Sequence, residues 1–301
     1  MNTTHKKSII KLHPVSPFKP QNTVSVLVII LLIFSFCSFK QDEKIKWVAI
    51  GDSITYLNDH PDETGNRSGE GYLTKVCTDL KFVEYINQGH NGWKATDIAK
   101  QIETLNMVEA DVYTVFLGTN DWWHGIPVGS LDDYTNDKGI GTSSGAFRKI
   151  INKIRSLNKN AKIILITPMQ RSDFVYINNS KNNAFGSYQK KNNQSLEEFA
   201  KAVAAIGAYE KFPVVDLYNE KKLDIVHLVK FKRLKDPKTG EYRNFKYPEF
   251  TKIPFNPETD EYPYPVSAAG MTYDGLHPSG EGNAVIAGLV EKKFQELFKQ
   301  R

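Results

Sequence analysis

The chain has 301 residues, of which 40% are hydrophobic and 24% are charged. This length can bury one substantial core, and the composition excludes a disordered or fibrous chain. The formal net charge of +5 is concentrated at the N-terminus, because residues 1–37 contain four lysines and no acidic residue. The remaining residues carry a charge near +1, which excludes the basic surface that a nucleic-acid partner requires.

An uncharged apolar run of sixteen residues, 24–39, follows these lysines. The pattern predicts an export signal over residues 1–37, and the run is shorter than the roughly 20 residues of a spanning helix. A signal peptide is therefore favoured over an uncleaved anchor. Cys37 and the polar residues after it resemble a bacterial lipoprotein junction, whereas Phe36 argues for ordinary cleavage. We expect a protein that is secreted, periplasmic or lipid-anchored at the cell envelope.

The second cysteine, Cys77, has no intramolecular partner once the signal is removed. It lies at helical spacing with Leu73, Val76 and Leu80, which predicts a buried structural thiol. The histidines of the chain show no metal-ligand spacing, so no metal site is predicted.

Short apolar segments alternate with helical patterns after residue 45, which is typical of parallel strands joined by crossover helices. We predict a three-layer α/β/α sandwich with a roughly five-stranded parallel sheet, in one domain over residues 46–299. The expected strands are 47–50, 83–86, 112–117, 163–166 and 213–217.

Three helices are indicated by apolar stripes, over 147–157, after a capping box at Ser195 and Glu198, and over 285–297. Some segments break the alternation and are expected to be loops. The longest is an insertion at about 221–272, where the turn at 236–240 predicts a small hairpin. Its aromatic residues either pack the insertion or line a sugar-binding surface. The other two expected loops are 56–69 and 122–145.

Ser53 follows the first expected strand directly, in the sequence Gly-Asp-Ser-Ile-Thr at 51–55. Ligands of open parallel sheets bind outside the carboxyl ends of the strands, so this serine is a candidate site residue. The alternative is that Asp52 and Ser53 only cap a helix or form a turn. Three further polar blocks occur near other strand ends and the last helix, at 87–92, 118–121 and 274–278.

These four blocks, in this order, resemble the SGNH/GDSL hydrolase family of serine esterases. The resemblance implies that Ser53 is the nucleophile and that His277 is the general base, oriented by Asp274. It also implies an oxyanion hole made by the backbone N–H groups of Ser53 and Gly92 and by the side chain of Asn120. A serine hydroxyl needs such a base and such donors for acyl transfer, and the reaction requires no cofactor.

Two other features lie close to these blocks. The sequence Gly-Thr-Ser-Ser-Gly at 141–145 matches a nucleophile elbow. It follows a polar segment, so we interpret it as the cap of a helix that begins near Ala146. Trp122 and Trp123 follow the third block, and they either form a substrate-binding wall or pack their loop.

The sequence therefore predicts an exported serine esterase with an acyl-serine intermediate, acting on O-acetyl groups of carbohydrates. The partner would be a small-molecule or oligosaccharide ester, with no nucleic acid and with membrane attachment only through a lipidated Cys37 or an uncleaved signal. A lipase, lysophospholipase or thioesterase would use the same triad. Two non-enzymatic alternatives are an exported glycan-binding protein and a membrane-tethered structural protein.

Overall fold

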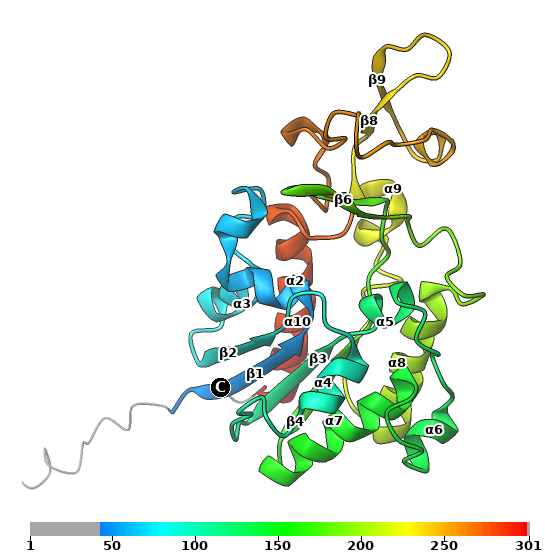
Figure 1. Ribbon diagram of the computed structural model, residues 1–301. Coiled ribbons are helices and arrows are strands. Elements are labelled where there is room, and N and C mark those ends of the chain that lie inside the picture. The colour runs from blue at the N-terminus through cyan, green and yellow to red at the C-terminus, as the bar shows by residue number, and fades with distance from the viewer. Residues whose placement is uncertain (1–42, 300–301) are drawn as a thin grey trace, which may run out of the picture. The chain divides into compact units, whose positions relative to one another are not determined.

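Five short apolar strands form one parallel sheet in the computed structural model, which describes residues 43–299. The order across the sheet is β2-β1-β3-β4-β7, and β2, β1, β3 and β4 are labelled in Figure 1. Burial on both faces explains their continuous apolar sequences. The bounds are β1 (Ile45–Gly51), β2 (Val83–Gly89), β3 (Val112–Phe116), β4 (Lys162–Ile166) and β7 (Val214–Val215). The predicted strands and the α/β sandwich are thus confirmed.

Successive residues of β1 pack on opposite sides of the sheet. Trp47 and Ala49 pack in a cluster with side chains of the helices at 72–79 and 280–297, whereas Val48 and Ile50 pack in a cluster with side chains of the helices at 95–101, 143–157 and 196–210. The result is the predicted three-layer arrangement. The sheet is the middle layer. One outer layer contains α3 (Tyr72–Asp79) and α10 (Gly280–Leu297), and the other contains α4 (Ala95–Gln101), α7 (Ser143–Leu157) and α8 (Leu196–Glu210).

Helix starts follow local capping chemistry. The capping box of Ser195 and Glu198 opens α8, as predicted. Helix α7 begins at Ser143, three residues before the expected start, because the Thr142 hydroxyl accepts a hydrogen bond from the N–H of Gly145. The motif at 141–145 is therefore a helix cap.

The segments expected as loops contain short elements of their own. The insertion forms the predicted hairpin, and Leu234, Phe250 and Tyr264 are buried in a small separate core there. These buried aromatic side chains pack the insertion. Its elements are η3 (Lys221–Leu223), α9 (Ile225–Leu228), β8 (Lys232–Lys235), β9 (Tyr242–Phe245), η4 (Glu249–Lys252) and η5 (Val266–Ala268).

An antiparallel hairpin after β4 was not predicted. It consists of β5 (Phe174–Tyr176) and β6 (Asn179–Ala184), and the polar residues of β6 show no apolar alternation. The remaining short elements are α2 (Ser53–Tyr56), η1 (Leu57–Asp59), η2 (Pro61–Thr64), α5 (Thr119–Trp123) and α6 (Leu131–Thr135).

The polar blocks meet because the parallel strands end together. Gly51 at the end of β1 pairs with Gly89 of β2 and with Phe116 of β3, and Phe116 pairs with Ile166 of β4. The segments that follow these strands therefore leave the sheet at one edge.

The N-terminal predictions fall outside the described residues. The predicted export signal over 1–37, including Cys37, lies in the part of the chain before residue 43. Among residues 43–299, no helix is long and apolar enough to cross a membrane. Cys77 of α3 packs against the core but is half-buried rather than fully buried as predicted. Desolvation still raises the pKa of its thiol to about 11, which suits a structural thiol.

Candidate active site

Ser53 and His277 are in direct hydrogen-bonding contact. Ser53 is the first residue of α2, immediately beyond β1, and His277 precedes α10. The serine hydroxyl donates to Nε2 of the imidazole at an O···N distance of 2.9 Å. Their exposed fractions are only 6% and 5%, so the pair is shielded from bulk water.

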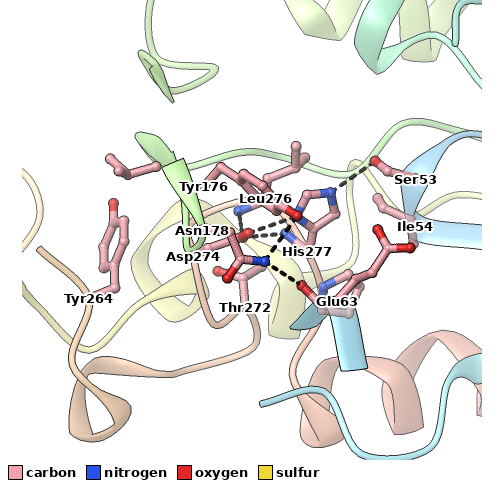
Figure 2. Close-up of polar contacts among 12 residues, drawn as sticks. Ser53, Ile54, Glu63, Tyr176, Asn178, Tyr264, Thr272, Asp274, Leu276 and His277 are labelled. Atoms are coloured by element: carbon pink, nitrogen blue, oxygen red, sulfur yellow. Dashed lines mark hydrogen bonds and ion pairs between the residues drawn. The ribbon is translucent and has the colours of Figure 1, made fainter. Parts of the chain in front are cut away.

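Asp274 holds His277 through both carboxylate oxygens. Oδ2 accepts a hydrogen bond of 2.7 Å from Nδ1 of the imidazole, while Oδ1 accepts from the backbone N–H groups of Leu276 and His277 at 3.0 and 2.8 Å. One oxygen therefore builds the turn and the other orients the ring (Figure 2). With the proton on Nδ1, Nε2 is free to accept the serine proton.

The segments that carry Gly92 and Asn120 are joined to the serine loop. The N–H of His90 donates to the Gly51 carbonyl oxygen at 3.0 Å, and the Asn120 amide donates to the Trp93 carbonyl oxygen at 3.0 Å. Gly92 is exposed and adopts φ +76°, and nothing lies within 4 Å of where its Cβ would be. The structure thus brings the second and third blocks to the edge where Ser53 lies.

A model of the GDSL-like lipase/acylhydrolase family matches residues 49–285. The chain belongs to this family. The resemblance of the four sequence blocks is thereby confirmed.

Two solved structures relate this GDSL-like hydrolase to other proteins. A possible lipase from Chitinophaga pinensis is 63% identical, with a TM-score of 0.84, and the match covers 84% of this chain and 99% of that chain. A protein from Lactobacillus plantarum is 19% identical, with a TM-score of 0.55 and coverage of 84% and 97%, and it shares the fold. No curated protein matches the chain.

Two buried carboxyl groups support the loops of the GDSL-like hydrolase. Asp52 caps α2 by accepting the N–H of Ile54 at 3.0 Å, and Asp121 accepts the N–H of Ala95 at 2.8 Å. Burial raises the pKa of each carboxyl group to about 6. The helix-cap interpretation of Asp52 is therefore correct, and it coexists with the placement of Ser53 beside His277.

The two tryptophans differ in position. Trp122 has no exposed surface, packs with Leu196 and Phe199, and donates its indole N–H to the Gln194 carbonyl oxygen at 2.9 Å. It therefore packs its loop, and the substrate-wall interpretation does not fit it. Trp123 is half-buried, and the Arg171 guanidinium and the Lys191 ammonium group lie 4.7 and 4.4 Å from its ring centroid.

Two aromatic rings beside the imidazole were not predicted from the sequence. The ring of Phe174 meets His277 edge-on at 5.4 Å, and the ring of Tyr273 lies nearly parallel to it at 6.0 Å. Tyr273 is a close neighbour in the sequence and could have been proposed. Phe174 belongs to the unpredicted hairpin, so no local signal pointed to it.

Other groups near the blocks make local contacts. The N–H of Gly89 donates to Oδ1 of Asn87 at 2.8 Å, so it is already used within its own segment. His90 stacks on Trp93 with ring centroids 4.4 Å apart. Among the described residues of this GDSL-like hydrolase, no group of three or more His, Cys, Asp or Glu residues could hold a metal ion.

Proposed function

We propose that this GDSL-like hydrolase is a serine esterase that acts through an acyl-Ser53 intermediate. The observation that carries the proposal is the continuous hydrogen-bonded series from the Ser53 hydroxyl through the imidazole to Asp274, at 2.9 and 2.7 Å. A serine hydroxyl becomes an effective nucleophile only when a positioned base removes its proton.

The reaction takes two acyl-transfer steps. As the Ser53 oxygen attacks the ester carbonyl carbon, its proton moves to Nε2 of His277, and Asp274 stabilises the imidazolium. The imidazolium then protonates the leaving alcohol as the tetrahedral intermediate collapses. In the second step His277 takes a proton from water, the hydroxide attacks the acyl carbon, and the proton returns to Ser53 as the acid leaves.

The oxyanion would be bound by the backbone N–H groups of Ser53 and Gly92 and by the Asn120 amide. Among the described residues, none accepts a hydrogen bond from the N–H of Gly92, and this residue is exposed, which supports the assignment. Donors in this arrangement stabilise charge that develops only in the transition state.

For the substrate, we propose O-acetyl groups on carbohydrates. The half-buried ring of Trp123, three residues after Asn120, supports this proposal, because a sugar ring could stack on it by displacing the Lys191 ammonium group that lies 4.4 Å from the ring centroid. The description of the Chitinophaga pinensis protein as a possible lipase favours a second candidate, the hydrolysis of lipid esters. Lysophospholipase and thioesterase activities would need the same residues.

A hydrolysis screen distinguishes these substrates. Acetylated oligosaccharides and p-nitrophenyl esters of increasing acyl length would be compared by kcat/KM. We expect preference for acetyl esters, and a preference for long acyl chains would instead identify a lipase. A fluorophosphonate probe should label the wild type and leave Ser53→Ala unlabelled. Folded wild-type protein that escapes labelling would identify the glycan-binding alternative.

We also propose that the protein is exported, on the basis of the lysines and the apolar run in residues 1–39. The mass and N-terminal sequence of the mature protein test this. Cleavage near residue 37 is expected, and a mass increment of a diacylglyceryl group on Cys37 would identify a lipoprotein. A mature chain that retains 24–39 would identify a tethered protein.

A further inference from the structure

We infer that Lys232, in the 221–272 insertion, is a positioning residue that holds the Asp274–His277 turn in place through a buried ion pair with Asp173. This inference rests on the proposed esterase function. It gives the insertion a role in catalysis, although the insertion contributes none of the groups that would touch the reacting atoms.

The first link is between the turn and the segment that follows β4. The N–H of Ser172 donates to the Gly275 carbonyl oxygen at 2.9 Å, and the N–H of Val175 donates to the Asp274 carbonyl oxygen at 3.2 Å. Gly275 has φ +92°, and a Cβ there would lie 2.0 Å from the Asp173 carbonyl oxygen. The backbone of Asp173 therefore lies directly against the turn.

The second link joins that segment to the insertion. Nζ of Lys232 lies 2.9 Å from Oδ2 of Asp173, and the exposed fractions of the two side chains are 4% and 13%. Oδ1 of Asp173 accepts hydrogen bonds from the N–H of Gly186 at 2.9 Å and from the Tyr188 hydroxyl at 2.5 Å. Asp173 is thus bonded at both oxygens, and Lys232 supplies its only direct positive charge among the described residues.

Two tyrosines of the insertion strengthen the same contact. The Tyr264 hydroxyl donates to the Asp173 carbonyl oxygen, and the Tyr262 hydroxyl donates to the Val175 carbonyl oxygen at 3.0 Å. Figure 2 shows Tyr264 on the side of Asp274 away from Ser53. The insertion therefore contacts the 172–175 segment on the side away from Ser53, and that segment is hydrogen-bonded to the Asp274–His277 turn.

The charge of the ion pair can be removed by a substitution that keeps the volume of the side chain. A buried ion pair that loses one partner leaves an uncompensated charge, and the remaining group moves to reach water. A movement of Asp173 would displace Gly275 and the Asp274 carboxylate. Displacements on the order of 1 Å at catalytic groups can cost about 10²-fold in rate.

The test compares Lys232→Met with Lys235→Met. Methionine retains most of the apolar stem, and Lys235 is an exposed lysine on the same strand. With p-nitrophenyl acetate, we expect Lys232→Met to lower kcat by ~10-fold or more, with KM changed by less than about twofold. Lys235→Met should match the wild type. Equal kcat values for Lys232→Met and the wild type would overturn the inference.

The same substitution in a protein that already carries Asp274→Asn distinguishes a positioning role of Lys232 from general destabilisation. If Lys232 acts through Asp274, then Lys232→Met should cost less than about twofold further in an Asp274→Asn protein. The same loss in both backgrounds would show that the effect is only structural. Should Lys232→Met fold poorly, the combination with Asp173→Asn removes the carboxylate that would move toward water, so both its Tm and its kcat should recover toward the wild-type values. A recovered Tm with a kcat as low as that of Lys232→Met would overturn the inference.

A measurement that does not depend on ester hydrolysis tests this inference separately from the esterase proposal. The proton on Nδ1 of His277, bonded to Asp274, gives a separate downfield NMR signal. We expect that signal to broaden or shift in Lys232→Met and to be unchanged in Lys235→Met. A wild type that lacks esterase activity but shows this difference would refute the function and support the positioning role. An unchanged signal would refute the positioning role.

Discussion

The side-chain amide of Asn120 donates a hydrogen bond to the backbone carbonyl oxygen of Trp93, with an N···O distance of 3.0 Å. This bond connects the third polar block to the second and fixes the orientation of the amide. An amide NH₂ group has two donors, so the second N–H remains available for a developing oxyanion.

We therefore predict that Asn120→Ala lowers kcat by ~10²–10³-fold, equivalent to about 2.7–4 kcal/mol of transition-state stabilisation. KM should change little, because the interaction forms only in the transition state. Steady-state kinetics with p-nitrophenyl acetate measure both constants. Asn182→Ala, at an exposed position of β6, is the control. A purely elevated KM for Asn120→Ala would argue against the oxyanion role.

Ser53→Ala and His277→Ala should each reduce turnover by ~10³-fold or more. Because the hydroxyl and the imidazole act in one step, the double variant should be little worse than either single variant. The same ester assay, run at high enzyme concentration, measures all three proteins. Losses that multiply would contradict a concerted mechanism.

Trp123→Ala should weaken the use of acetylated oligosaccharides and spare small esters. Loss of a stacking surface worth about 1.5 kcal/mol predicts a ~10-fold fall in kcat/KM for the oligosaccharide. Hydrolysis of p-nitrophenyl acetate should stay near the wild-type rate. Tyr209→Ala, which removes a ring that is 54% exposed on α8, is the matched control. An equal fall in kcat/KM for both substrates would show that Trp123 does not bind the sugar.

Asp52 makes stability depend on pH. Burial raises its pKa from an ordinary 3.8 to about 6, so the folded protein binds the proton more tightly than the unfolded chain. Its contribution to stability is therefore present below pH 4 and is lost as the pH rises to 6. The full change is on the order of 3 kcal/mol.

Asp52→Asn removes this titration while keeping an oxygen that can accept the Ile54 N–H. Relative to the wild type, the variant should gain stability as the pH rises from 4 to 6. Urea denaturation at several pH values measures the difference in unfolding free energy. A difference that stays constant over this range would show that Asp52 does not titrate in it.

The sequence predicted the sheet because its strands are buried on both faces and appear as short apolar runs. The run 163–166, for example, corresponds closely to β4. The site residues were identified by a family resemblance, and the contact between Ser53 and His277 confirms only that they lie together. The helix around Ser195 was predictable because its cap is local.

Features made by distant contacts could not be predicted. Trp122 is fully buried because Leu196 and Phe199 of α8 cover it, and its neighbours in the sequence do not indicate that. The strand Asn179–Ala184 pairs with β5 although it consists mainly of polar residues. The ion pair of Lys232 and Asp173 joins residues 59 positions apart, and neither residue stands out within its own segment.

The hydrogen bond between Ser53 and His277 spans 224 positions of the chain. Closing a loop of that length costs entropy that only a completed sheet with α10 docked on it can offset. Local helices form much sooner than such contacts. During refolding, the return of ester hydrolysis should therefore lag behind the return of helical structure, and turnover becomes a measure of the last assembly step.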